Sequence, residues 1–476
     1  MRAVAVVLVL GILAPALNTF IAATVMPSAV GDIGGLSLYA WATVAYSVAS
    51  IVGAAASSAL GRRQGLRLAF TVAGAIFIGG SVACGAAPTM AVLVAGRAVQ
   101  GFGGGMIIGI VHAMVRALFP EPLWASMLST ISLAWGIAAL TGPSVGGVLA
   151  GAGLWRAAFW VMAPFVTITV ILAWRLLAPP RRAGGEGDVR VPLARLLLLC
   201  GAVVALGSIA NVRGAPLRLA LAATMAGAIT GALALDARAL TRLFPSGMLS
   251  LRRPIGKCFW VIFLIAMSAS PIGIYVSLFM QVVHGLSPAV AGYVFATSSF
   301  AWTCAALVTA RIPPNRIRPA LVLGPLLLSA GLTSLYLTIG TGPVALITVA
   351  LAVNGIGIGT CWAHVGKVIL GSARAREEEA TAALIPSTQL FAIAFGGAVS
   401  GIIADAAGLT REASPDVAVA TAHILFGTFA ILALAAAVIA AQIHSSGAST
   451  AAVERGGPAA DGRPHPLETP SSDRSL

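Results

Sequence analysis

Long uncharged apolar stretches recur along the 476-residue chain, and they limit its possible folds more than any other feature. A helix needs roughly 20 mainly apolar residues to cross a bilayer. The chain is 58% hydrophobic and 9% charged, whereas soluble proteins are about a quarter charged. The pattern predicts an all-α integral membrane protein with fourteen spanning helices. The expected spans are 3–29, 39–60, 68–87, 89–115, 124–150, 156–178, 193–211, 217–235, 257–283, 288–310, 319–340, 343–366, 380–404 and 417–443.

Positive charges predict how these helices are oriented. With the N-terminus inside the cell, the inner loops hold twenty arginines and lysines, and the outer loops hold four. Because positively charged loops stay on the cytoplasmic side, we expect a multi-pass protein of the cell inner membrane with both termini in the cytoplasm. The net charge of +14 is therefore attributed to the basic loops that orient the helices in the membrane. No basic stripe with interleaved aromatic residues predicts a nucleic-acid partner.

The fourteen helices divide into two groups of six with a pair between them. Residues 1–178 form the expected N-terminal bundle, and 257–443 form the C-terminal bundle. Residues 179–256 hold two cytoplasmic linkers and a central hairpin, which spans the membrane or else lies on its surface and leaves twelve spans. Residues 444–476 are rich in Ala, Gly, Ser and Pro, so a disordered cytoplasmic tail is expected.

A weak internal repeat supports the division into halves. Ser129-Thr130 opens the fifth expected helix, and Ser387-Thr388 opens the thirteenth. Basic loops at 61–67 and 311–318 follow the second helix of each half. Two six-helix halves related by a parallel repeat are typical of transporters whose substrate path lies between the halves.

Residues 129–151 combine the hydropathy of a spanning helix with residues that disturb helices. Proline removes a backbone donor and glycine removes the side chain, so this helix should bend and let a neighbour approach its backbone. Neighbouring helices can satisfy the freed carbonyl group in a membrane. The stretch is predicted to be a hinge, with close packing as the alternative. The residues concerned are Gly136, Gly142, Pro143, Gly146 and Gly147.

Four short motifs are shared with one known family. Gly142-Pro143-Ser144-Val145-Gly146-Gly147 is similar to its antiporter motif, and Arg97-Ala98-Val99-Gln100-Gly101 to its buried Arg-x-x-Gln-Gly. Two more of its motifs are similar to Trp155-Arg156, at the start of its sixth helix, and to Gly285-Leu286-Ser287-Pro288, between its ninth and tenth helices. The motifs resemble the major facilitator superfamily, most closely its fourteen-helix drug:proton antiporters. The resemblance implies the major facilitator fold, two six-helix bundles with an inserted two-helix hairpin, and efflux of drugs or metabolites in exchange for protons.

Two positions depart from this family where it usually carries an acid. In the first helix Asn18, followed by Thr19, replaces a carboxylate, and in the loop after the second helix Arg62 replaces an Asp. Both replacements argue against standard proton coupling. By resemblance the loop is nevertheless expected to act in gating. Its expected gating residues are Arg62, Arg63, Gly65 and Arg67.

Polar residues inside the apolar stretches are candidates for a substrate and coupling path, because they are costly in a membrane. Arg97 should lie about 12 Å into the fourth helix, with Gln100 on the same face. Histidine titrates near neutral pH, so His112 is a candidate proton relay. The alternatives are an arginine bonded to carbonyl groups, a polar histidine at a helix end, and ordinary helix packing. The predicted path residues are Asn18, Thr19, Arg97, Gln100, His112, Gln281, Asn354, His364 and Gln389.

The fifteen acidic residues all avoid the middle of the expected spans. A cation moved into low dielectric must be paired with a carboxylate. The substrate is therefore predicted to be neutral, zwitterionic or anionic. Asp32 and Asp405, at the outer ends of core helices, are the carboxylates best placed for proton exchange, or else ordinary interfacial acids.

The sequence lacks the motifs of several other function classes. It contains no phosphate-binding Gly-x-x-x-x-Gly-Lys-Ser/Thr loop and no His/Cys cluster with metal-ligand spacing. We therefore expect no enzyme, no metal and no cofactor, with the proton gradient as energy source and a monomer in the bilayer acting on a small-molecule substrate. The alternatives are an uncoupled or histidine-coupled metabolite transporter, and a non-transporting membrane scaffold or sensor.

Overall fold

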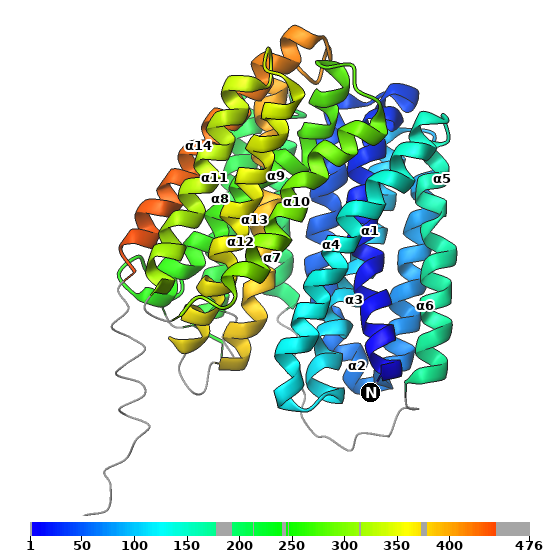
Figure 1. Ribbon diagram of the computed structural model, residues 1–476, viewed down its shortest axis with the longest axis vertical. Helices are drawn as coiled ribbons and strands as arrows, with labels where there is room; N and C mark the ends of the chain where they lie inside the picture. The colour runs from blue at the N-terminus through cyan, green and yellow to red at the C-terminus, as the bar shows by residue number, and fades with distance from the viewer. Residues whose placement is uncertain are drawn as a thin grey trace, which may run out of the picture.

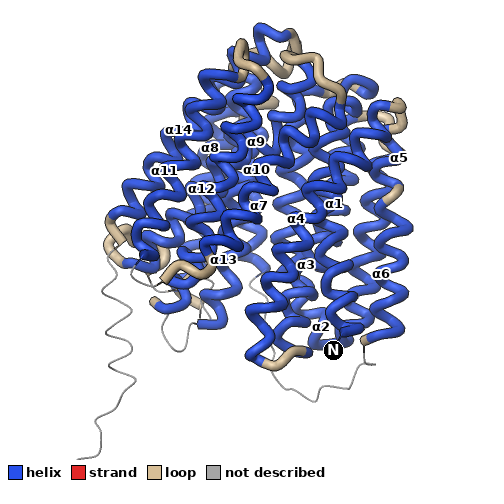
Figure 2. The backbone as a smooth tube through the Cα atoms, viewed as in Figure 1, coloured by secondary structure: helices blue, strands red, loops and turns tan. Residues whose placement is uncertain are grey.

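The computed structural model describes residues 2–177, 193–212, 214–239, 244–245, 247–313, 316–372 and 378–443. Regular structure in these residues is helical, with no strand, as Figure 1 and Figure 2 show. The predicted tail at 444–476 and the linker at 179–192 lie outside the described residues. The elements are α1 (Arg2–Ile33), η1 (Leu36–Leu38), α2 (Tyr39–Gly85), α3 (Met90–Leu118), α4 (Glu121–Gly151), α5 (Trp155–Trp160), α6 (Met162–Leu176), α7 (Leu193–Ser208), α8 (Ala215–Ala237), α9 (Pro254–Val282), α10 (Pro288–Thr309), α11 (Ile317–Thr338), α12 (Val344–Gly371), α13 (Glu378–Ala406) and α14 (Pro415–Ala441).

Thirteen helical segments in the described part of the chain are long and apolar enough to cross a membrane. α2 supplies two of them, because it continues through Gly65, where the backbone leaves the helical region with φ 82° and ψ 161°. α5 and α6 together make one span, Trp155–Leu176. The remaining apolar segment is α7, which at 16 residues is shorter than the predicted span 193–211. The predicted all-α integral membrane fold is therefore confirmed.

The spans form two bundles, α1 to α6 and α9 to α14, as the predicted major facilitator fold requires (Figure 1). In the first bundle α2 packs along α3, and α1 packs along α4. In the second bundle α12 packs along α10 and α11. The bundles meet where α4 contacts α10 and where α2 contacts α13. The inserted hairpin lies beside this junction, because α7 packs against α13 and α2, whereas α8 packs mainly against α7.

The same glycine spacing occurs in both bundles at helix pairs that carry buried polar residues. A Cβ added to Gly101 of α3 would overlap the Tyr46 carbonyl oxygen of α2, and Gly355 of α12 stands in the same relation to Ser298 of α10. Small residues let membrane helices approach this closely. α3 and α12 thus occupy equivalent places in a parallel repeat. The equivalent glycines are Gly101, Gly103 and Gly105 in α3, and Gly355, Gly357 and Gly359 in α12.

Candidate functional site

The two bundles touch at the end of the molecule opposite residues 2 and 443, here named the closed end; the other end is named the termini end. At the closed end α4 and α10 cross with their backbones close together, and a Cβ added to Gly147 would overlap Ala289. A Cβ added to Gly292 would lie 2.6 Å from the Thr24 hydroxyl oxygen and 3.0 Å from the Pro143 Cβ. The Gly-Pro-x-x-Gly-Gly segment therefore lies in the contact between the bundles.

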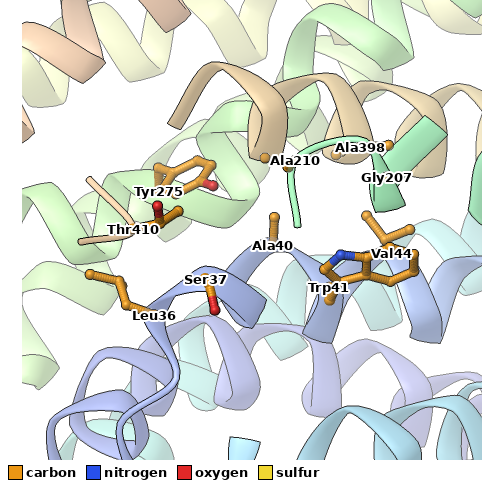
Figure 3. A pocket seen from close by; sticks show the side chains of 12 residues that line it. Leu36, Ser37, Ala40, Trp41, Val44, Gly207, Ala210, Tyr275, Ala398 and Thr410 are labelled. Atoms are coloured by element: carbon orange, nitrogen blue, oxygen red, sulfur yellow. The ribbon is translucent and has the colours of Figure 1, made fainter. Parts of the chain in front are cut away.

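A second contact between the bundles, where α2 meets α13, lies at the same end. The Ala40 methyl carbon is 3.3 Å from the place where a Cβ of Gly401 would stand. The neighbouring residue, Trp41, packs against α7: a Cβ added to Gly207 would lie 2.8 Å from the Trp41 ring. Figure 3 shows Ala40 between Trp41 on one side and Tyr275 of α9 on the other. Small residues thus bring α2, α7 and α13 together.

Aromatic side chains fill the space between the bundles at mid-depth. The Phe20 ring of α1 lies 5.6 Å from the Phe295 ring of α10 and 6.5 Å from the Trp135 ring of α4, between centroids. Slightly nearer the termini end, the Thr303 methyl carbon is 3.3 Å from an added Cβ of Gly136. Beyond this level Figure 1 shows the bundles diverging toward the end that carries the N-terminus. The helices of the two bundles therefore lie closer together at the closed end than at the termini end.

Arg97 is the centre of a buried polar cluster inside the first bundle. Its side chain is 3% exposed. The guanidinium donates from Nε to the Ala42 carbonyl oxygen at 3.2 Å and from Nη1 to Gln100 Oε1 at 2.6 Å, and it lies 4.2 Å from the Tyr46 ring centroid. Gln100 donates in turn to the Ser81 hydroxyl oxygen at 2.8 Å. Arg97 and Gln100 share one helix face, as the spacing predicts.

The cluster reaches α1 through Tyr46. Asn18 and Ser50 lie beside the Tyr46 hydroxyl group. Asn18 is fully buried, and neither atom of its amide has a hydrogen-bond partner among the described residues. The Tyr46 hydroxyl group is likewise without a partner in that part of the chain. Thr19 points elsewhere and donates to the Pro15 carbonyl oxygen at 2.9 Å.

A related polar pair lies at the equivalent place in the second bundle. Asn354, which replaces Gln100 in the repeat, is fully buried and accepts a hydrogen bond from the Ser298 hydroxyl group at 3.1 Å. Leu351 stands where the first bundle has Arg97, so the second bundle has no cation at this position. Nearer the termini end of α12, the buried His364 ring lies beside Lys367 and the Thr309 backbone.

The remaining predicted path residues do not join either cluster. His112 follows Arg97 by fifteen residues, about 22 Å along α3, and its Nδ1 bonds to the Ile108 carbonyl oxygen at 2.8 Å. Gln281, at the closed end of α9, donates to the Ser277 hydroxyl oxygen at 3.3 Å. Gln389 lies half-buried on α13.

The segment predicted to be a hinge packs directly on α1. A Cβ added to Gly142 would lie 2.5 Å from the Phe20 Cβ, and one added to Gly146 would lie 3.2 Å from the Ile21 carbonyl oxygen. Pro143 stands inside α4, which continues as one helix through it. The segment thus contacts α1 with one face and α10 with another.

The predicted gating loop forms the join between the two spans of α2. Gly65 takes the positive φ that ends one span and starts the next. Arg67 donates from Nε to the Leu177 carbonyl oxygen, and its guanidinium lies 5.8 Å from the Trp174 ring centroid. It therefore fastens α2 to the end of α6. The side chains of Arg62 and Arg63 lie outside the described residues.

The two acids proposed for proton exchange both accept hydrogen bonds at the closed end. Asp32 accepts hydrogen bonds from Arg156 and from the Trp155 indole, and its side chain is 50% exposed. Asp405 accepts a hydrogen bond from the Thr410 hydroxyl group at 2.7 Å. Tyr46, Ser50 and Ser81 belong to the Arg97 cluster but are absent from the predicted path. The sequence signal for Tyr46 is its spacing of four from Ser50, which matches that of Gly101 and Gly105.

Comparisons with known proteins agree with this architecture. A family model described as Major Facilitator Superfamily matches residues 8–384. A probable multidrug-efflux transporter of Mycobacterium tuberculosis is 33% identical over 448 residues, which are 92% of this chain and 93% of the relative. The structure of a D-xylose-proton symporter is similar with a TM-score of 0.69 and 15% identity, over 94% of this chain and 99% of that chain. The inward open xylose transporter from E. coli has a TM-score of 0.63 and 13% identity, over 94% and 98%.

Proposed function

The chain belongs to the major facilitator superfamily, and we propose that it exports small, amphipathic organic molecules by alternating access, in exchange for protons. Its relatives are transporters rather than enzymes. The Mycobacterium tuberculosis protein, named as a probable multidrug-efflux transporter, supports efflux of drugs or metabolites. The positive charges of the loops support the cell inner membrane as its location, with both termini cytoplasmic.

The observation that carries the proposal is the one-sided contact between the bundles. With cytoplasmic termini, the closed end faces outward, and its contacts Gly147–Ala289 and Gly292–Thr24 obstruct the path to the outside. The diverging ends of the bundles then face the cytoplasm (Figure 1). Rocking of two bundles about a site between them is the usual transport cycle of such repeats. An exporter must load its cargo in this inward-facing state.

The Asn18, Tyr46 and Arg97 cluster is the proposed polar site beside the path. Leaving a buried polar group unpaired costs about 1–3 kcal/mol, which a bonded substrate group would recover. Within the described residues Arg97 has no carboxylate at ion-pair distance. The net charge of this site is therefore positive, and we propose neutral, zwitterionic or anionic molecules as substrates.

One observation favours uncoupled transport as a second candidate. Asn18 lies fully buried beside Tyr46. A carboxylate at this position would be the simplest proton carrier, but an amide does not titrate. Proton exchange then depends on another group, such as Asp32 or Asp405. Without such a group, the same rocking cycle would run down the substrate gradient.

Uptake into inside-out membrane vesicles tests these alternatives. We expect uptake of neutral or anionic fluorescent compounds to rise with an imposed pH gradient and to fall when a protonophore removes it. Uptake that does not change with the gradient would support the uncoupled transporter. If a correctly inserted protein takes up no compound of any charge, the result would support the non-transporting scaffold.

A further inference from the structure

An apolar groove separates the inserted hairpin from the second bundle. α7 and α8 form one wall, and α9 and α13 form the other. Ser387 and Thr388 are the hydroxyl residues in a lining otherwise made of aliphatic and aromatic side chains. Apolar cavities of this kind do not hold water. In a membrane, such a groove is suited to hydrocarbon.

The groove remains open because α7 packs on α13 and α2, whereas α8 packs mainly on α7. Arg195 of α7 and Asp236 of α8 form an ion pair with side chains 12% and 5% exposed. Asp236 also accepts a hydrogen bond from the Phe244 backbone N–H at 3.0 Å. This holds Phe244, within the connection to α9, at the same place. α8 itself packs mainly on α7, which leaves the gap toward α9.

The depth of the groove matches one leaflet of a bilayer. Its lining on α13 runs from Leu384 to Phe395, which spans about 17 Å at the rise of an α-helix. Half of the roughly 30 Å hydrocarbon core is about 15 Å. Both α9 and α13 begin at the termini end, where the lining also begins. The groove therefore runs from the membrane surface at the termini end to about the mid-plane.

The mouth of the groove at that surface is positively charged. Arg252 and Arg253 are exposed and lie a few residues after Met248 and Leu249, which line the groove. The Trp260 indole donates to the Leu249 carbonyl oxygen at 3.2 Å, so the arginine segment is fastened to the groove wall. The nearby charge of Asp236 is already paired with Arg195. Basic side chains at this level attract anionic lipid headgroups.

From this geometry we infer that the groove binds an anionic phospholipid of the surrounding leaflet. One acyl chain lies between α8 and α9, and the phosphate lies at Arg252 and Arg253. The apolar wall supplies affinity for the chain, and the two guanidinium groups select the headgroup. This assignment is independent of any transport activity.

Tryptophan quenching by brominated lipid tests the inference, because Trp260 lines the groove. The full chain is reconstituted into phosphatidylcholine vesicles with increasing phosphatidylglycerol carrying brominated acyl chains. The Trp260 signal is the difference between the wild type and Trp260→Phe. We expect it to reach half-quenching at a mole fraction roughly tenfold lower for brominated phosphatidylglycerol than for brominated phosphatidylcholine.

Three variants separate the parts of the site. Arg252→Gln with Arg253→Gln should remove the headgroup preference, whereas Arg218→Gln, at the other end of α8, should retain it. Ala202→Phe, which fills the groove from α7, should remove saturable quenching by either lipid. Quenching linear in mole fraction for both headgroups would overturn the inference. So would a Trp260 signal that responds only to an added drug, because that result would assign the groove to substrate.

Discussion

The close approach of Gly292 to α1 and α4 allows a direct test of the proposed inward-facing state. Replacing Gly292 with valine places a side chain where even an added Cβ would lie 2.6 Å from the Thr24 hydroxyl oxygen and 3.0 Å from the Pro143 Cβ. Both neighbours belong to the other bundle and lie in helices, so they cannot yield without moving the bundles apart. Overpacking of this kind costs about 1–3 kcal/mol. The equilibrium should shift about 5- to 150-fold away from the state with the closed end shut.

Spin labels at Ala152 and Val290, in a Cys304→Ser background, would report this shift as a distance distribution. Ala152 and Val290 are exposed on the two sides of the closed end, and Cys304 is the exposed cysteine among the five. We expect Gly292→Val to lengthen the main distance and to slow export. Gly273→Ala on α9 is the matched control, because an added Cβ there meets nothing within 4 Å. An unchanged distribution and rate in Gly292→Val would refute the reasoning.

Three further substitutions test the polar cluster and the join in α2. Arg97→Gln leaves the Ala42 carbonyl oxygen and Gln100 without their donor; vesicle uptake should fall at least about tenfold, while Arg218→Gln, at an exposed arginine, should retain more of it, and equal loss in both would contradict a specific role. Asn18→Asp introduces a carboxylate beside Tyr46, so uptake should become pH-dependent and extend to cationic dyes; a flat pH profile would argue against coupling at this position. Gly65→Ala places an alanine at φ 82° and ψ 161°, a backbone conformation essentially restricted to glycine. It should lower the free energy of unfolding by about 1–3 kcal/mol, more than the helical Gly61→Ala does; equal melting temperatures would show that the join relaxes.

The span boundaries could be read from the sequence with small errors. The predicted 288–310 is observed as Pro288–Thr309, and 417–443 as Pro415–Ala441. The bilayer leaves no water for backbone groups, so an apolar run of sufficient length must become a helix. The seventh helix was predicted too long, as 193–211 rather than Leu193–Ser208. Hydropathy does not mark the point where the chain turns within an apolar run.

Part of the polar site could also be anticipated. Arg97 and Gln100 are three residues apart, so helix geometry alone puts them on one face. The observed hydrogen bond between them follows from that spacing. The partners on other helices could not be derived, because spacing within one helix says nothing about which residue of α2 faces it. Tyr46 under the guanidinium is such a partner.

The sequence by itself determined the membrane class, the number of apolar runs, and the residues too polar for lipid, because these follow from transfer energies of single segments. The tertiary structure alone decided which end of the two bundles is shut, since that depends on Gly147 meeting Ala289 and Gly292 meeting Thr24. It also decided that Asn18 shares a cluster with Arg97, and that α8 stands away from α9. These are contacts between segments distant in the chain, and they are set by how small residues let helices approach.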